Sequence, residues 1–250
     1  MDQIGAINDD DVFGKVYLEF YQKKGPGYYF FERNDGLLQY RLSETYFQDY
    51  HHWIKEEKSL IQTIFDNNFN SVLDIGSGAG RTSLYLQDRD RDVVALDISK
   101  GAIEVCRLRG IRNVFHGDIF DYRSSHFFDC VLLLGNNLAI CKDYEGTKDL
   151  INKCKELINP SGQILLHYFS VIPTQNQDYL RYHDVNKSHG KRIGEITARI
   201  RYRTMTSSWF KLFLPTEEQF LELTEKTGLA IINKWKSSET SFYVQLAKNE

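Results

Sequence analysis

A short apolar run that leads directly into three closely spaced glycines most constrains how this chain can fold. Residues 72–75 are apolar except for one aspartate, and they are followed by Gly76, Gly78 and Gly80, with a helical pattern starting at Arg81. A strand, a glycine loop and a helix in this order let a ligand approach backbone that side chains would otherwise block. The segment therefore predicts a binding turn at the carboxyl end of a buried parallel strand.

Strand and helix patterns alternate at short intervals through the middle of the chain. Strands are predicted at 71–75, 92–96, 113–116, 128–134 and 163–168, with helices at 81–87, 99–108 and 150–158 between them. This alternation is typical of an α/β fold with a Rossmann-like, doubly wound sheet whose strands are mostly parallel. Pro160 to Gly162 is expected to end the third of these helices.

The alternation stops after the fifth strand. Residues 171–194 are expected to be loop, and strands are predicted at 196–202 and 209–214. Thr216 and Gln219 form the pattern of a capping box at the start of a helix that ends at Gly228. Two closing strands follow at 229–235 and 241–247, and their close spacing predicts an antiparallel pair.

The N-terminal region does not follow the core pattern. Val12, Val16 and Phe20 share one helix face, whereas residues 28–53 are aromatic and look irregular. We therefore expect an N-terminal helical cap at 1–54 and a core domain at 55–250. The core domain would carry a β insertion at about 171–214, on the substrate side.

Composition excludes several classes of protein. The 250 residues include 31 Lys and Arg against 34 Asp and Glu, and this net charge of −3 does not suggest a general polyanion binder. No apolar run approaches the ~18 residues of a membrane span. The four cysteines form no C-x-x-C pair, so we expect buried, reduced thiols and no metal site. Together with an acidic N-terminus that lacks a signal-peptide pattern, this predicts a cytoplasmic protein.

Acidic and amide side chains follow successive strands of the predicted sheet. Asp97 lies 21 residues after Gly76, where a carboxylate can bind both ribose hydroxyls, and Asp118 ends the third strand. The dinucleotide fingerprint needs a further glycine where this chain has Arg81. Asp74 would repel a diphosphate but could hold an ammonium group. S-adenosylmethionine, with adenosine at one end and a cationic amino acid at the other, suits this arrangement better than NAD.

Four ordered motifs resemble those of class I S-adenosylmethionine-dependent methyltransferases. They are VLDIGSGAGR, VVALDIS, GDIF and FDCVLLLGNN, and the terminal strand pair adds to the likeness. The resemblance covers about residues 70–170 and 216–247, and it is strongest to a bacterial and archaeal subgroup with a segment like that of residues 32–36. It implies that the cofactor is S-adenosyl-L-methionine. The cofactor-binding residues expected on this basis and from the strand ends are Asp74, Gly76, Ser77, Gly78, Gly80, Arg81, Asp97, Ile98, Asp118, Ile119, Gly135 and Asn136.

Three of these residues have a structural alternative. Asp97 could instead cap a helix, a role for which Ser99 competes. Arg81 could pair with Asp74 or reach the cofactor carboxylate, or it could be a surface arginine in the first turn of a helix. Asp118 could contact the amine of adenine or serve only as a turn residue.

Candidates for the substrate site come from the cap, the end of the fourth strand and the insertion. Arg199, Arg201 and Arg203 share one face of a predicted strand, which could bind a carboxylate, a phosphate or an RNA backbone, or lie in solvent. The residues expected to contact the substrate are Tyr29, Tyr46, Asn137, Tyr182, Arg199 and Arg201. His167 and His183 are the candidate general bases, needed only if the acceptor arrives protonated; either could instead be structural.

The chain is therefore expected to transfer a methyl group to N or O of a small molecule, anionic if the arginines bind it. An RNA methyltransferase, a non-catalytic subunit that binds S-adenosylmethionine and an NAD-dependent oxidoreductase are the alternatives. The −3 charge makes a nucleic-acid partner the weaker prediction, and the sequence does not specify the oligomeric state.

Overall fold

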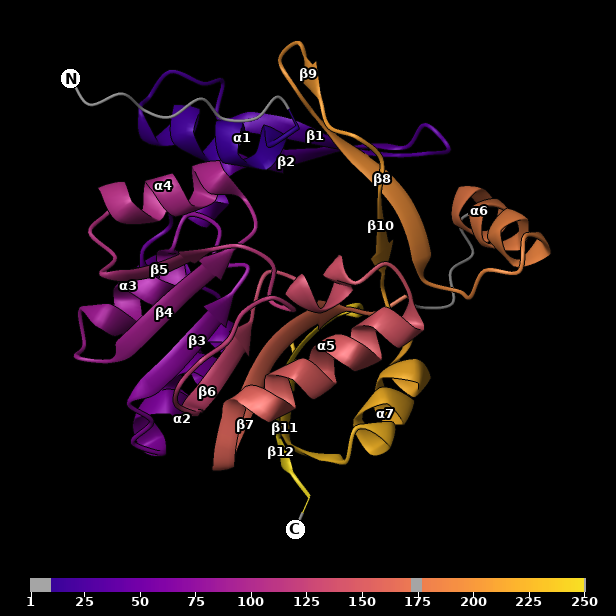
Figure 1. Ribbon diagram of the computed structural model, residues 1–250. Helices are drawn as coiled ribbons and strands as arrows, with labels where there is room; N and C mark the ends of the chain where they lie inside the picture. Colours follow the sequence, from indigo (N-terminus) through magenta and orange to yellow (C-terminus); the bar gives the residue numbers. More distant parts are fainter. Residues whose placement is uncertain (1–9, 172–176, 250) are drawn as a thin grey trace.

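Two sheets organise the protein, a large core sheet and a smaller cap sheet above its carboxyl edge (Figure 1). The computed structural model describes residues 10–171 and 177–249. The seven strands of the core sheet lie in the order β11-β12-β7-β6-β3-β4-β5. In chain order they are β3 (Ser71–Ile75), β4 (Asp92–Asp97), β5 (Asn113–His116), β6 (Phe128–Leu133), β7 (Ile158–Phe169), β11 (Leu229–Lys236) and β12 (Ser241–Lys248).

Helices cover both faces of the core sheet because its strands are apolar on both faces. The side chains of Val72 and Leu132 pack toward α2 and α3, whereas Leu73 and Leu133 pack toward α5. The helices on the first face are α2 (Lys55–Asp66), α3 (Arg81–Gln87) and α4 (Lys100–Leu108), and those on the second are α5 (Tyr144–Leu157) and α7 (Glu217–Lys226). Strand β12 runs antiparallel to β7. The predicted Rossmann-like fold with a terminal antiparallel strand is confirmed.

The cap sheet corrects the expectation of an irregular aromatic segment at 28–53. Strands β1 (Tyr28–Arg33) and β2 (Leu38–Leu42) form a hairpin there, followed by two short 3-10 helices, η1 (Ser43–Tyr46) and η2 (Tyr50–His52). The cap is therefore not helical alone. Strand β1 also pairs with β8 (Glu195–Tyr202) of the insertion, and the order is β10-β8-β1-β2 with β9 beside β8. The remaining elements of the cap are α1 (Val12–Tyr21), β9 (Met205–Thr206) and β10 (Phe210–Phe213).

Two further expectations need correction. Residues 177–188, predicted as loop, form helix α6. This helix has no apolar stripe, because the face it turns inward carries Tyr179, Tyr182, His183 and Asn186. The third predicted helix ends at Leu157 and not at the Pro-Ser-Gly triplet, since β7 already begins at Ile158, with an irregularity where it pairs with β6.

The capping box before α7 is confirmed. The Gln219 backbone N–H donates to Thr216 Oγ1 at 3.1 Å, and the Thr216 backbone N–H donates to Gln219 Oε1 at 2.8 Å. Two donors that a helix start leaves unpaired are thereby satisfied. The short 3-10 helix η3 (Asn137–Ile140) follows β6 and leads to the cavity described next.

Candidate active site

A cavity of about 1880 Å³ lies between the carboxyl edge of the core sheet and the inner face of the cap sheet. Sites for one small ligand are usually ~300–1,000 Å³, so this cavity has room for two. The core sheet contributes the ends of β3, β4, β5 and β6, and the cap contributes α1, the β1–β2 hairpin and α6. The predicted site residues that line it are Tyr29, Tyr46, Asp74, Gly76, Ser77, Gly78, Arg81, Asp97, Ile98, Asp118, Ile119, Gly135, Asn136, Asn137 and His183.

The glycine loop is fixed to the end of the neighbouring strand. The N–H groups of Gly76 and Ser77 donate to the Leu96 carbonyl at 2.8 and 3.0 Å, and the Gly78 N–H donates to Asp97 Oδ2 at 2.8 Å. Gly76 has φ +68°, and a Cβ on it would lie 2.3 Å from Asn137 Nδ2. The loop therefore keeps its backbone open to the cavity only with glycine at this position.

Three carboxylates face the cavity from successive strand ends. Asp74 is buried, accepts a hydrogen bond from Ser83 Oγ at 2.6 Å, and has a pKa that burial raises to about 6. Asp97 accepts from the N–H groups of Gly78 and Ser99, and burial raises its pKa as well. Asp118 accepts from the Phe120 N–H at 2.9 Å, the contact of a turn residue, while it also lines the cavity. Together, these three carboxylates favour a cationic ligand that carries hydroxyl groups over a diphosphate.

Arg81 does not pair with Asp74. Its Nη2 donates to Glu57 Oε1 at 2.5 Å, and its guanidinium stacks on the Trp53 ring, 4.5 Å from the centroid. Glu57 is a buried residue of α2 that the sequence reasoning missed. The ion pair holds the first turn of α3 against α2, and Arg81 still borders the cavity.

Two asparagines and a histidine connect the ends of β6 and β7. Asn137 Nδ2 donates to the carbonyls of Ile75 and Gly76, each at 2.8 Å, so this predicted substrate residue supports the glycine loop. The Asn136 N–H donates to His167 Nδ1 at 3.0 Å, which leaves His167 Nε2 to donate to Ser241 Oγ at 3.0 Å.

His167 is therefore not placed as a general base. Both of its ring nitrogens are engaged, it does not belong to the cavity lining, and burial lowers its pKa to about 4. Gly80 also lies outside the lining. A Cβ on Gly80 would lie 2.1 Å from Ile111 Cδ1, so this glycine allows close packing.

A wall of tyrosines stands over the glycine loop. Tyr29 and Tyr46 join through their hydroxyls at 2.6 Å, and the Tyr46 ring packs edge-on against Tyr17 with centroids 4.7 Å apart. A Cβ on Gly78 would lie 3.6 Å from the Tyr17 hydroxyl, which places this wall directly over the loop. Aromatic faces at this point suit a cationic ligand. Tyr29 and Tyr46, predicted as substrate residues, line the cavity on the side of the glycine loop, whereas Tyr17 was missed.

The arginine strand points away from the cavity. On β8, Ala198 and Ile200 are buried toward α1, so the alternating Arg199 and Arg201 occupy the opposite face. Arg199 makes two hydrogen bonds to Glu32, at 2.7 and 3.1 Å, and Arg201 lies 3.5 Å from the same carboxylate. Neither arginine lines the cavity, which corrects their assignment to substrate binding.

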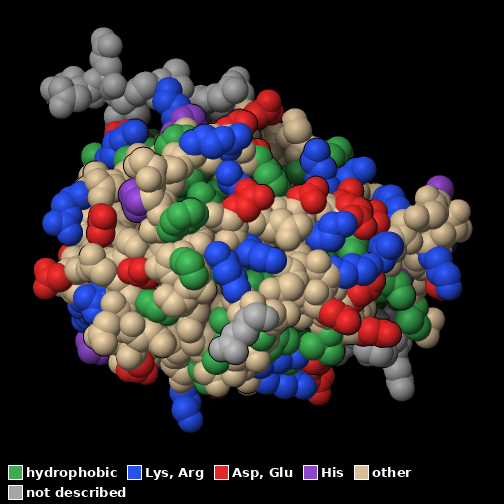
Figure 2. Space-filling view, turned by 60° about the horizontal axis from the view of Figure 1, so that its bottom comes forward, with side chains coloured by type: hydrophobic (Ala, Val, Ile, Leu, Met, Phe, Trp, Pro, Cys, Tyr) green, Lys and Arg blue, Asp and Glu red, His purple; other side chains and the backbone are tan. Residues whose placement is uncertain are grey.

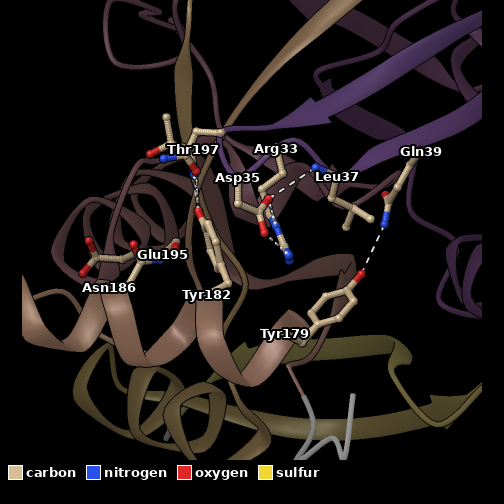
Figure 3. A network of polar contacts seen from close by, with 10 residues as sticks. Arg33, Asp35, Leu37, Gln39, Tyr179, Tyr182, Asn186, Glu195 and Thr197 are labelled. Carbon is tan, nitrogen blue, oxygen red and sulfur yellow. Dashed lines mark hydrogen bonds and ion pairs between the residues drawn. The ribbon is translucent and has the colours of Figure 1, made fainter. Parts of the chain in front are cut away.

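Tyr182 also has a structural role in place of the predicted substrate contact. Its hydroxyl donates to Asn34 Oδ1 at 2.9 Å and accepts from the Thr197 N–H at 3.1 Å, so it fastens α6 to the cap sheet (Figure 3). Tyr182 is buried and does not belong to the cavity lining.

Besides Arg81, two arginines of the hairpin, Arg33 and Arg41, face the cavity. Arg33 makes two hydrogen bonds to Asp35, at 2.8 and 2.6 Å, and its guanidinium lies over the rings of Tyr179 and Tyr182 (Figure 3). Arg41 donates to Gln39 Oε1 at 2.6 Å, and within the described ranges it makes no ion pair. Arg41 is thus the hairpin cation best placed to meet an anionic group in the cavity.

His183 borders the cavity from α6. Its Nδ1 is buried and has no hydrogen-bond partner among the residues that the structure describes. Burial, assisted by the nearby Arg33 guanidinium, lowers the pKa of His183, so its imidazole is neutral at neutral pH.

Comparison with known proteins identifies the core. Residues 72–162 match the family model of the methyltransferase domain. The chain carries a methyltransferase domain. The prediction of a class I S-adenosylmethionine-dependent methyltransferase is thereby confirmed, and the match spans the glycine loop and the strand ends that line the cavity.

Solved structures agree in fold. A SAM-dependent methyltransferase from Bacteroides fragilis, in complex with S-adenosyl-L-homocysteine, is 20% identical, covers 98% of each chain and gives a TM-score of 0.80. One from Clostridium acetobutylicum is 13% identical over 97% of this chain and 100% of that chain, with a TM-score of 0.61. The sugar N-methyltransferase KedS8 from Streptoalloteichus is 13% identical over 84% and 94% of the two chains, with a TM-score of 0.57. No curated protein sequence matches this chain.

Most of the residues that the sequence reasoning missed lie outside the methyltransferase domain. Asp11 is one: its carboxylate accepts from the N–H groups of Gly14 and Gly101 and from Ser99 Oγ, so it joins the starts of α1 and α4. An aspartate directly before an amphipathic helix is a recognisable capping signal. Tyr17 and Arg41 carried no comparable signal.

Two kinds of feature are absent from the part of the chain that the structure describes. No group of three His, Cys, Asp or Glu side chains in ranges 10–171 and 177–249 is arranged to hold a metal ion. In the same ranges, no helix is long and apolar enough to cross a bilayer.

Proposed function

We propose that this chain binds S-adenosylmethionine along the carboxyl edge of the core sheet and transfers its methyl group to N or O of a small molecule held under the cap sheet. The observation that supports the proposal best is the cavity itself. One side of it carries a glycine loop and three carboxylates, and the other carries aromatic rings and cations. The cofactor supplies both the methyl group and the leaving group, so the protein mainly binds, orients and excludes water.

The residues present fit the cofactor. Asp74 is ionised when an ammonium group is nearby, Asp97 offers carboxylate oxygens to the ribose, and Asp118 with Ile119 borders the position of adenine. Ser77 and Gly78 bring open backbone toward the amino-acid part of the cofactor. Tyr17, Tyr29 and Tyr46 cover that part with aromatic surface, which favours positive charge and keeps water away.

The acceptor then lies toward the hairpin and α6. Arg41 and Gln39 face this part of the cavity, which supports an acceptor with a carboxylate or phosphate. His183 is the remaining candidate for a general base, and Nδ1 or Nε2 of a neutral imidazole can take a proton from a hydroxyl or ammonium acceptor. We also propose a boundary between the N-terminal cap and the core domain at about residue 54, and a cytoplasmic location for the protein.

Calorimetric titration with S-adenosylmethionine, S-adenosylhomocysteine and NAD tests the cofactor assignment. We expect micromolar binding of the first two and none of NAD; binding of NAD alone would contradict the proposal. Release of S-adenosylhomocysteine is then measured with matched pairs of small amines and alcohols, with and without a carboxylate, and with tRNA as control. Tight cofactor binding without turnover on any acceptor would favour the non-catalytic alternative.

The RNA methyltransferase alternative loses its main support in the structure. It rested on the arginine strand, whose Arg199 and Arg201 are bound to Glu32 and face away from the cavity. On the face that Figure 2 displays, Lys and Arg side chains are interspersed with Asp and Glu and form no continuous basic surface.

A further inference from the structure

The outer face of the cap sheet, which points away from α1 and the cavity, carries an unusual set of side chains. Alternation along β1 and β2 places Tyr28, Phe30 and Tyr40 on this face together with Leu38 and Leu42. The strand register sets Phe30 between Tyr40 on β2 and Arg201 on β8, and it sets Glu32 between Leu38 and Arg199.

The centre of this outer face is apolar and exposed. The ring centroids of Tyr28, Phe30 and Tyr40 lie 5.2–6.0 Å from one another, and these side chains with Leu38 and Leu42 are 36–53% exposed. A hollow of about 640 Å³, separate from the main cavity, is bordered by Tyr28, Phe30, Leu38 and Arg201. Contiguous apolar surface of this kind usually marks an interaction site.

The carboxylate in the middle of the same face is paired with arginines. Glu32 binds Arg199 and lies 3.5 Å from Arg201. A polyanion would meet the Glu32 carboxylate in the middle of the surface, so the charges disfavour nucleic acid. Aromatic rings and arginines around an apolar centre are instead the side chains enriched in protein interfaces.

A second copy of the same chain fits this pattern. In a two-fold symmetric contact one patch faces itself, so the patch must be self-complementary. The apolar centre of one copy can pack against the apolar centre of the other. Because two-fold symmetry reverses the row that carries Glu32 and Arg199, Glu32 of each copy can lie beside Arg199 of the other. We propose that the outer face of the cap sheet joins two copies of this chain about a two-fold axis. The main cavities stay open in such a dimer because they lie on the other face of the sheet.

Light scattering coupled to size exclusion, run on the full chain from about 5 to 100 µM, tests this proposal. The expected mass is twice 29.2 kDa. Tyr40→Glu should raise the dimer dissociation constant at least tenfold, because it places a charge in the apolar centre. Phe127→Glu is the matched control, since Phe127 is an exposed aromatic residue outside this face. Circular dichroism and S-adenosylhomocysteine affinity report whether each variant is folded.

Cross-linking gives a second test that does not depend on destabilising the interface. The four native cysteines are buried, so Tyr40→Cys adds a single accessible thiol. A short bis-maleimide should convert Tyr40→Cys, but not Phe127→Cys, to a covalent dimer. A monomeric wild-type chain at 100 µM overturns the proposal, as does a dimer that persists in Tyr40→Glu. A monomer that binds a labelled oligouridine more weakly after Tyr40→Glu would assign the face to nucleic acid instead.

Discussion

Asp74 shows how burial prepares one carboxylate for a cationic ligand. Its pKa is raised to about 6 by burial, whereas the unfolded chain titrates near 4. Between these values the folded protein holds more protons than the unfolded chain, so this group's contribution to stability falls as pH rises from about 4 to 6. An ammonium group beside Asp74 would favour the ionised carboxylate and so offset this loss of stability.

The first prediction follows from this titration. Affinity for S-adenosylhomocysteine should rise up to about tenfold per pH unit below pH 6 and level off above it, because binding needs Asp74 ionised. Calorimetry at pH 5, 6, 7 and 8 measures this dependence. Asp74→Asn should bind weakly with a flatter profile, and identical profiles for the two proteins would refute the role.

Asp97 gives a second prediction. Asp97→Ala should weaken S-adenosylhomocysteine binding more than about tenfold, since a charge-assisted hydrogen bond contributes ~1.5–3 kcal/mol. The variant also removes the acceptor for the Gly78 N–H, which should weaken the affinity further because the glycine loop loses this contact. Asp92→Ala, at the other end of β4, is the control and should bind normally. Unchanged affinity in folded Asp97→Ala would mean that the ribose lies elsewhere.

His183 supports a third prediction, which concerns turnover alone. Once an acceptor is known, His183→Gln should lower kcat while the affinity for S-adenosylhomocysteine stays the same. In the wild type, kcat should fall only at pH values below the ordinary pKa of histidine, because burial lowers the pKa of His183 and the base stays neutral to lower pH. His189→Gln is a suitable control, since His189 lies on the exposed end of the same segment. An unchanged kcat in His183→Gln would contradict the assignment.

At the level of elements, the core was predicted from sequence, as were α1, β8 and β10 of the cap, whereas the β1–β2 hairpin and α6 were not. The core strands carry continuous apolar runs, so their pattern is strong. Helix α6 is held by polar contacts: Tyr182 to Asn34 and Thr197, Asn186 to the Glu195 carbonyl, and Gln39 to Tyr179 (Figure 3). Hydrophobic periodicity does not detect a helix of this kind. The hairpin did leave a signal, because Asp35-Gly36 is a typical turn pair and Gly36 has φ +93°.

The same limits explain which residues of the candidate site could be predicted from sequence. Strand-end residues such as Asp97 line the cavity as expected, because topology alone brings them to one edge. The roles of Arg199 and Arg201 were not, because alternation shows which residues share a face but not which face is inward.

A fourth prediction concerns the docking of α6. Tyr182→Phe keeps the ring but removes the hydroxyl that donates to Asn34 and accepts from the Thr197 N–H. Amides of α6 should then exchange with solvent several-fold faster, since each lost bond contributes ~0.5–1.5 kcal/mol. Hydrogen exchange with mass spectrometry measures this. Tyr179→Phe removes the hydroxyl that accepts from Gln39 Nε2 over a longer distance, 3.3 Å, and should have the smaller effect. Equal effects would argue against a central role for Tyr182.

For the whole molecule, ligand binding and stability should be linked. A ligand at 100 times its Kd stabilises the folded state by ~2.7 kcal/mol, which for a chain of this size raises Tm by about 5–10 °C. S-adenosylhomocysteine should produce this shift in calorimetric melting, and NAD should not. A shift with NAD, or none with either ligand, would contradict the cofactor assignment.

The cap sheet has a consequence for synthesis of the chain. Glu32 on β1 and Arg199 on β8 are neighbours, yet 167 residues separate them. A ribosome that adds ~5–20 residues per second leaves β1 without this partner for about 8–35 s. During that time an aromatic, unpaired strand edge protrudes from the nascent polypeptide. The hairpin at residues 28–42 is therefore the segment that a chaperone would be expected to shield first.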